Sequence, residues 1–193
     1  IAEDKMGRVK ECGPEIAFAL AREEEAATLM NLLAAGELPL RVTHNDTKLN
    51  NVMLDADTHE AVCVIDLDTV MPGLAANDFG DLVRFGANTG AEDEKDLTKI
   101  GLSMHNYEQL LEGFLAACGD ALTEKEVLTL PMGGKLMTLE CGVRFLTDYL
   151  SGDVYFRIHR PEHNLDRCRT QFKLVASMEE NWDAMMQRVQ AVR

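Results

Sequence analysis

The side chains best suited to chemistry are concentrated between His44 and Asp81. The run His44-Asn45-Asp46-Thr47-Lys48-Leu49-Asn50-Asn51 has the form H-x-D-x-x-x-x-N, and the run Val64-Ile65-Asp66-Leu67-Asp68 follows it. Carboxylate and amide oxygens are hard ligands of the kind that Mg²⁺ prefers. A further carboxylate beside them could accept the proton of a reacting hydroxyl group. Together the two runs indicate phosphoryl transfer, which depends on positioning and on neutralising charge more than on covalent chemistry.

A polar turn between the two runs would bring their side chains together. If the chain folds back near Thr58, residues whose numbers add up to about 117 lie opposite one another in an antiparallel hairpin. Asn51 and Asp66 then become neighbours, and Asp46 lies in the loop that enters the first strand. We therefore expect Asn51 and Asp66 to hold the Mg²⁺ ion of a nucleotide. Asp46 would orient the acceptor hydroxyl and receive its proton.

The elements that must position these groups begin with a helix and a small β region. Apolar residues at helical spacing predict one long amphipathic helix from Pro14 to Ala35, which Gly36 ends. A short strand is predicted from Leu38 to Thr43, and two more strands lie between Asn51 and Asp68. The β region is therefore expected to be small and enclosed by helical sequence.

Helices are predicted for most of the remaining chain, in the segments 78–85, 107–118, 123–150 and 164–193. Asp78 can cap the first of them with its side chain. The pattern Thr123-Glu124-Lys125-Glu126 is a capping box that opens the third. Pro131 and the pair Gly133-Gly134 are expected to kink or split that third helix.

The composition excludes several classes of protein. The chain has 193 residues, and its 19 Lys and Arg against 33 Asp and Glu give a net charge of −14, which would repel a nucleic acid backbone. Apolar runs such as Ala61 to Ile65 are far too short to cross a membrane. Five cysteines without a C-x-x-C pair, and an opening sequence unlike a signal peptide, favour free thiols in a cytoplasmic protein. The remaining histidines fit no metal spacing and are expected at the surface or as caps: His59, His105, His159 and His163.

These motifs carry a resemblance to a known family. The segments Val42 to Asn51, Ile65 to Asp68 and Asn77 to Leu82 resemble the C-terminal lobe of the aminoglycoside phosphotransferase and choline kinase family, whose fold is related to that of protein kinases. The resemblance implies an α+β, mostly helical, protein kinase-like C-terminal lobe with a small β-hairpin catalytic region. A more specific similarity, to the N-acetylhexosamine 1-kinases, covers residues 65–94, 146–156 and 163–172.

The resemblance implies both an activity and a set of catalytic residues. Such an enzyme uses ATP and Mg²⁺ to phosphorylate a sugar, here the anomeric hydroxyl of an N-acetylhexosamine. Asp46 would be the catalytic base, and Asn51 and Asp66 would bind the metal. Asp68 would lie near the metal, either as a ligand or behind the ligands.

Four further residues receive supporting roles from the same resemblance. His44 would be structural, with its ring hydrogen-bonded to the backbone around Asp66, and Asp78 would brace the catalytic loop by accepting backbone N–H groups. Arg144 and Tyr155 would be hydrogen-bonding partners of the sugar. The implied partners are therefore ATP and a small-molecule sugar, with neither a nucleic acid nor a membrane.

One part of such a kinase is not evident in the sequence. Residues 1–43 contain no strand-bound G-x-G-x-x-G loop and no lysine suited to the nucleotide phosphates. We therefore expect residues 1–193 to be the catalytic and acceptor-binding lobe of a longer kinase, without its nucleotide-gripping N-terminal lobe and poorly active alone.

Two alternatives remain open. The acceptor could be choline, an aminoglycoside or homoserine instead of a sugar, because net charge cannot select a pocket. The chain could also be a kinase-like binding module without catalysis. The joint presence of Asp46, Asn51 and Asp66 argues against that second alternative, because a decayed site has no physical need for all three.

Overall fold

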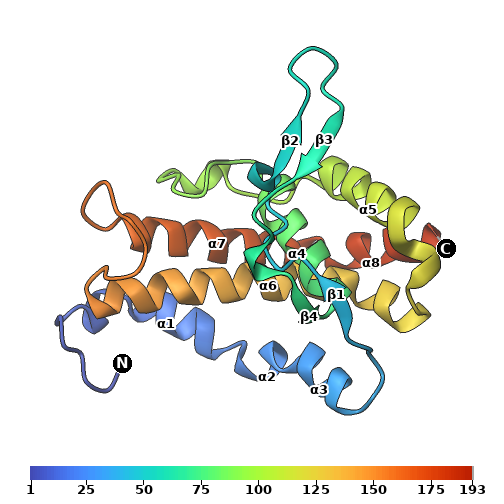
Figure 1. Ribbon diagram of the computed structural model, residues 1–193. Coiled ribbons are helices and arrows are strands. Elements are labelled where there is room, and N and C mark those ends of the chain that lie inside the picture. Colours follow the sequence, from blue (N-terminus) through green and yellow to red (C-terminus); the bar gives the residue numbers. More distant parts are fainter. Residues whose placement is uncertain (193) are drawn as a thin grey trace.

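The structure, a computed structural model, describes residues 1–192 and consists mainly of helices with a small β region (Figure 1). The helices are α1 (Gly13–Leu20), α2 (Glu23–Ala26), α3 (Thr28–Ala34), α4 (Ala75–Gly86), α5 (Met104–Cys118), α6 (Glu124–Ser151), α7 (His163–Glu180) and α8 (Trp182–Ala191). The strands are β1 (Arg41–Thr43), β2 (Val52–Leu54), β3 (Ala61–Val64) and β4 (Met71–Gly73). The predicted fold class, a mostly helical α+β lobe of the protein kinase type, is confirmed.

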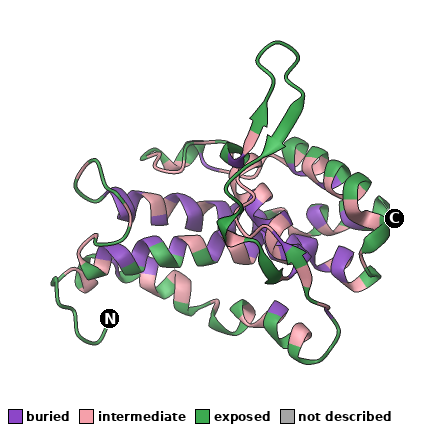
Figure 2. Cartoon of the chain, in the orientation of Figure 1, coloured by how far each residue is buried: buried purple, intermediate pink, exposed green. Residues whose placement is uncertain are grey.

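The core lies around α6, the longest helix. α4 packs along one part of α6 and α7 along another, and α6 and α7 run side by side in Figure 1. Their facing sides are buried, whereas the β2–β3 hairpin is exposed over most of its length (Figure 2). One hydrophobic cluster joins Phe79 of α4 to Leu130 of α6 and Leu174 of α7. This packing supports the β1–β2 loop and the segment after β3, which lie mostly outside the helices.

A close crossing of α4 and α6 depends on two glycines. A Cβ atom added to Gly133 would collide with the carbonyl oxygen of Ala76, and one added to Gly80 would collide with the carbonyl oxygen of Gly133. Of the kink or split expected at Pro131, the split is wrong, because α6 continues as one helix from Glu124 to Ser151.

The long helix predicted from Pro14 to Ala35 is wrong, since this segment forms three short helices. Arg22 explains the first break: its guanidinium makes two hydrogen bonds to the carboxylate of Glu179, at 2.9 and 2.6 Å, and a third to the carbonyl of Phe18. Its side chain therefore fixes the chain against α7 where a straight helix would continue past it. Apolar periodicity could not reveal this ion pair between distant segments.

The last predicted helix is likewise divided in two. Asn181 separates α7 from α8, and its side-chain amide donates a hydrogen bond of 2.8 Å to the carbonyl of Ser177. An asparagine that bonds the backbone in this way competes with the helical hydrogen bonds and favours a break. The expected end of this helix, at Arg193, lies outside the described residues.

The two sheets are both antiparallel pairs. In the hairpin Val52 pairs with Val64, so the paired numbers add up to 116 and Asn51 lies opposite Ile65, not Asp66. The predicted register is therefore wrong by one residue. β4, which the sequence did not predict, pairs with β1 and places Gly73 opposite Arg41. A Cβ atom at Gly73 would collide with the hydroxyl of Thr43, which explains the glycine in this edge strand.

Two expectations from composition concerned membrane-spanning helices and the cysteines. No helix within residues 1–192 combines the length and the apolar character needed to span a membrane. The cysteines are free, and Cys12 and Cys168 are buried whereas Cys63 is exposed.

Candidate active site

The loop between β1 and β2 holds the carboxylate of Asp46 by one of its oxygens. Lys48 Nζ lies 2.7 Å from Oδ2 of Asp46, and Asn51 Nδ2 donates to the same Oδ2 at 2.9 Å. Asn51 also donates to the backbone carbonyl of Asp46 at 2.8 Å. Within residues 1–192 no hydrogen bond reaches the other oxygen, Oδ1. The side chain of Asp46 is 26% exposed, so this free oxygen is partly open to solvent and to a ligand.

This arrangement keeps Asp46 ionised. Partial burial would raise the pKa of the Asp46 carboxyl, but the hydrogen bonds from Lys48 and Asn51 outweigh it and lower the pKa below its usual value. An ionised carboxylate with one fixed and one free oxygen can orient a hydroxyl group and accept its proton as the hydroxyl reacts. Lys48 adds positive charge next to the place where the acceptor would lie.

The carboxylate of Asp78 stabilises the backbone of this loop. Its Oδ2 accepts the backbone N–H of His44 at 2.8 Å, and its Oδ1 accepts that of Asn45 at 2.7 Å. The hydroxyl of Thr47 donates to the backbone carbonyl of Asp78 at 2.6 Å. Asp78 lies in the first turn of α4, whose N-cap is Leu74, so the expected helix start at Asp78 is wrong by one turn. The carboxylate of Asp78 therefore accepts N–H groups of the β1–β2 loop and does not cap its own helix.

The segment that follows β3 is attached to the same loop by several hydrogen bonds. Ile65 N–H donates to the carbonyl of Asn51 at 2.9 Å, and the ring of His44 donates from Nε2 to the carbonyl of Ile65 at 3.1 Å. Further along, the hydroxyl of Thr69 donates to the carbonyl of His44 at 2.6 Å, and Asn45 Nδ2 donates to the carbonyl of Thr69 at 3.0 Å. These bonds hold residues 65–69 beside the loop that carries Asp46.

Asp66 and Asp68 lie within this attached segment. Asp66 has a left-handed backbone, with φ of 61°, and Asp68 lies in the short 3₁₀ turn that follows it. Both side chains are exposed, and neither makes a hydrogen bond or ion pair with the described part of the chain. The backbone N–H of Ile65 bonds the carbonyl of Asn51, so Asp66 is the residue that follows the end of the pairing.

The donor set at this position fits a Mg²⁺ ion. Asn51 uses its amide nitrogen to bind Asp46, which leaves its Oδ1 free, and Asp66 and Asp68 offer unpaired carboxylates. These are oxygen ligands, and Mg²⁺ bound to a nucleotide needs only one or two of them from the protein. Among the described residues no group of three or more His, Cys, Asp or Glu side chains is placed to hold a metal by itself. The set of Asn51, Asp66 and Asp68 contains only two side chains of these four types.

Arg144 and Tyr155 form a separate pair. The guanidinium carbon of Arg144, on α6, lies 5.7 Å from the centre of the Tyr155 ring and 5.4 Å from that of Phe156. Arg144 also lies 3.7 Å from Glu140, one turn earlier on the same helix. Tyr155 is 73% exposed in the loop that follows α6. An exposed aromatic face beside a cation can stack on and hydrogen-bond a polar ring.

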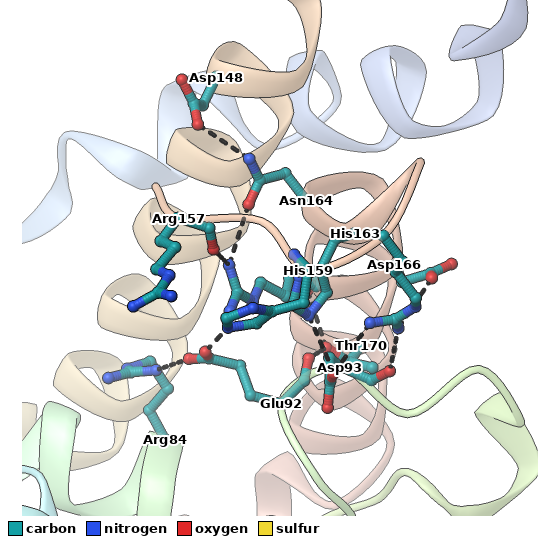
Figure 3. Close-up of polar contacts among 12 residues, drawn as sticks. Arg84, Glu92, Asp93, Asp148, Arg157, His159, His163, Asn164, Asp166 and Thr170 are labelled. Atoms are coloured by element: carbon teal, nitrogen blue, oxygen red, sulfur yellow. Dashed lines mark hydrogen bonds and ion pairs between the residues drawn. The ribbon is translucent and has the colours of Figure 1, made fainter. Parts of the chain in front are cut away.

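A network of charged groups ties the acidic loop after α4 to α7 (Figure 3). Glu92 lies 3.1 Å from Arg84, and Asp93 lies 2.9 Å from Nε2 of His163 and 3.0 Å from Arg160. Of the two roles expected for His163, a surface position or a cap, the surface position is wrong, because the side chain is buried and both ring nitrogens are hydrogen-bonded. The backbone N–H of His159 donates to Nδ1, so the proton on Nε2 points to Asp93.

Sequence reasoning missed several residues that the geometry brings into the site. Lys48 is two residues after Asp46 and inside the motif, so its proximity to the base could have been inferred. The side chains of Asn45 and Thr69 join the loop of Asp46 to the segment after β3. Each donates a hydrogen bond to a backbone carbonyl of the other segment, which residue types do not reveal. Asp148 is a buried acid among apolar residues of α6, and a carboxylate in such a stretch is the sequence signal for it.

Comparison with known families agrees with the geometry. The sequence model described as the phosphotransferase enzyme family matches residues 1–122, which is more than half of the 193 residues. The matched part contains both sheets, the loop of Asp46 and helices α1 to α5. Arg144 and Tyr155 lie outside it.

Proposed function

Since the chain belongs to this phosphotransferase enzyme family, we propose that it is the catalytic and acceptor-binding lobe of a kinase that transfers phosphate from ATP to a small molecule. The observation that carries the proposal is the state of Asp46, an ionised carboxylate with one oxygen held by Lys48 and Asn51 and the other free. Free carboxylates at Asp66 and Asp68, attached to the same loop, support the same proposal.

Asp46 is the base in the proposed reaction. The acceptor hydroxyl binds to its free Oδ1, which turns the oxygen of that hydroxyl towards the γ-phosphate. As the new O–P bond forms and the bond to the leaving ADP breaks, the hydroxyl proton passes to Asp46. Lys48 stabilises the negative charge of the Asp46 carboxylate. Asp78 and His44 hold the loop in place through hydrogen bonds to backbone groups.

Members of this family generally use ATP and Mg²⁺. Asn51 and Asp66 are the proposed ligands of the metal, with Asp68 beside them, and the ion would neutralise charge on the nucleotide phosphates. A cytoplasmic location would supply ATP and suit five unpaired cysteines.

For the acceptor we propose a sugar, and specifically the anomeric hydroxyl of an N-acetylhexosamine. The exposed ring of Tyr155 offers a flat apolar face, and the half-exposed guanidinium of Arg144 offers hydrogen-bond donors next to it. A sugar ring needs this combination of a stacking surface and polar contacts. A cationic acceptor such as choline would instead be repelled by Arg144.

The test is a panel of acceptors with the full-length gene product. ATP and Mg²⁺ are supplied with N-acetylglucosamine, N-acetylgalactosamine, choline, kanamycin or homoserine, and phosphorylated products are identified by ³¹P NMR. The proposal predicts a phosphate on the anomeric oxygen of an N-acetylhexosamine. Phosphorylation of choline, kanamycin or homoserine alone would reject the sugar but keep the kinase. An absence of transfer to any acceptor, with ATP bound, would favour a binding module.

A further inference from the structure

The carboxylate of Asp148 accepts four hydrogen bonds at the end of α6. Its Oδ1 accepts the backbone N–H groups of Val154 and Tyr155, both at 2.9 Å. Its Oδ2 accepts the N–H of Phe156 at 3.0 Å and Nδ2 of Asn164 at 2.8 Å. Asp148 is only 5% exposed, so its charge is compensated mainly by these donors. Figure 3 shows Asp148 and Asn164 facing one another across α6 and α7.

Three of these donors are consecutive backbone amides. One carboxylate that binds three successive N–H groups fixes the backbone of residues 154–156 more closely than a single cap would. Hydrogen bonds to an ionised acceptor are also about twice as strong as those between neutral groups. The loop therefore takes its conformation from Asp148, a residue on the preceding helix.

The rings above this backbone are held in turn. Tyr155 packs edge to face against Phe156, with ring centres 4.7 Å apart, and Phe156 packs against Phe145 of α6 at 4.6 Å. The guanidinium carbon of Arg144 lies 5.7 Å from the centre of the Tyr155 ring and 5.4 Å from that of Phe156. Since the backbone N–H of Tyr155 itself is bound to Asp148, the exposed ring can be presented in one orientation.

We propose that Asp148 is a positioning residue for the acceptor: it fixes residues 154–156 so that Tyr155 presents its ring to the sugar. This inference rests on the proposed function, because it assigns a purpose to Tyr155 only if that ring binds the acceptor. Asp148 does not touch the acceptor. Loss of its carboxylate should therefore weaken acceptor binding and leave ATP binding unchanged.

The test compares Asp148→Asn with Asp153→Asn as a matched control. The carboxylate of Asp153 is also buried and binds Arg8 and Asn164, but it accepts no N–H group of residues 154–156. Two quantities are measured on the full-length gene product: hydrogen exchange at the amides of residues 154–156, and the KM for acceptor and for ATP.

Asp148→Asn retains one acceptor oxygen, so the three amides should exchange faster and the acceptor KM should rise about tenfold, with the KM for ATP unchanged. Asp153→Asn should leave these amides protected and the acceptor KM within about twofold of wild type. Unchanged exchange in Asp148→Asn, or faster exchange with an unchanged acceptor KM, would overturn the inference.

A third variant, Tyr155→Ala, separates this inference from the proposed function. If Tyr155→Ala raises the acceptor KM and Asp148→Asn does not, only the role of Asp148 is wrong. If Tyr155→Ala also leaves the acceptor KM unchanged, the proposed acceptor site falls and the inference falls with it. Should Asp148→Asn fail to fold, Asn164→Ala removes one of the four donors and should raise the acceptor KM about threefold. No rise in that variant would overturn the inference.

Discussion

Lys48 Nζ lies 2.7 Å from Oδ2 of Asp46, the same oxygen that accepts a hydrogen bond from Asn51. Both donors therefore act on one side of the carboxylate. The other oxygen is left for a substrate, and the donors keep the group in its basic form.

Substitution of Lys48 should change the pH dependence of the reaction. Burial raises the pKa of Asp46, and the contacts with Lys48 and Asn51 lower it by more. Lys48→Met should therefore raise the pKa of Asp46. Because the reaction needs ionised Asp46, the acid limb of the kcat/KM profile should move to higher pH.

The matched control for this prediction is Lys125→Met. Lys125 makes a surface ion pair with Glu37 at 2.8 Å, far from Asp46 in the chain. It should leave the acid limb in place. An acid limb that stays fixed in Lys48→Met, or that moves equally in both variants, would show that Lys48 does not set the pKa of the base.

Substitution of Asp78 should loosen the catalytic loop. Asp78→Asn keeps one acceptor oxygen and turns an amide group towards either His44 N–H or Asn45 N–H, which leaves a donor unpaired. The free energy of unfolding should fall by about 2 kcal/mol, and kcat should fall as well. Urea denaturation and steady-state kinetics measure the two effects. Asp120→Asn, at an exposed position, is the control, and an equal loss in both variants would contradict the role of Asp78.

The crossing of α4 and α6 predicts opposite effects for two glycine substitutions. Gly133→Ala should lower the free energy of unfolding by about 2 kcal/mol, because its Cβ would collide with the backbone of Ala76. Gly113, inside α5, has no atom within 4 Å of an added Cβ. Gly113→Ala should raise the free energy of unfolding by about 0.5–1 kcal/mol, since alanine favours the helix. Thermal denaturation that shows the same sign for both would contradict this packing.

The pair of Arg41 and Glu126 predicts a pH dependence of stability. Arg41, in β1, makes two hydrogen bonds to Glu126 at 2.8 and 2.7 Å, and these lower the pKa of Glu126 although burial opposes them. A carboxyl with a lowered pKa contributes stability above its unfolded pKa and loses it as the pH falls through the folded value. Arg41→Met should therefore lower the free energy of unfolding at neutral pH.

That cost should shrink as the pH falls through the lowered pKa of Glu126, because the carboxylate is then protonated in both proteins. The measurement is urea denaturation of both proteins across this range. A cost that stays constant down to low pH would show that the carboxylate of Glu126 is not what Arg41 stabilises.

The catalytic segments could be predicted from sequence because their geometry is local. The hairpin between Asn51 and Asp66 was predicted because its turn residues are adjacent in the chain, but its register was wrong by one residue, and Ile65 lies opposite Asn51. The strand β4 was missed because Pro72 and Gly73 disfavour a strand, and only its pairing with β1 stabilises it.

The elements that depend on distant contacts could not be predicted in this way. Arg22 interrupts the first helix through Glu179, which lies far away in the chain. Asp148 fixes its loop through backbone amides, which have no sequence signature. Its position on a buried face was nevertheless a signal, because a buried carboxylate requires donors.

The role of Asp46 as the base is tested most directly by the turnover of Asp46→Asn in the full-length gene product, with Asp57→Asn in the exposed hairpin turn as control. Asn keeps the size of the side chain but cannot accept the acceptor proton as a carboxylate does. We expect kcat for ATP-dependent phosphorylation to fall about 10²- to 10⁴-fold in Asp46→Asn, with an unchanged melting temperature, and to stay at the wild-type value in the control. A kcat that remains within about twofold of wild type would contradict the role of Asp46 as the base.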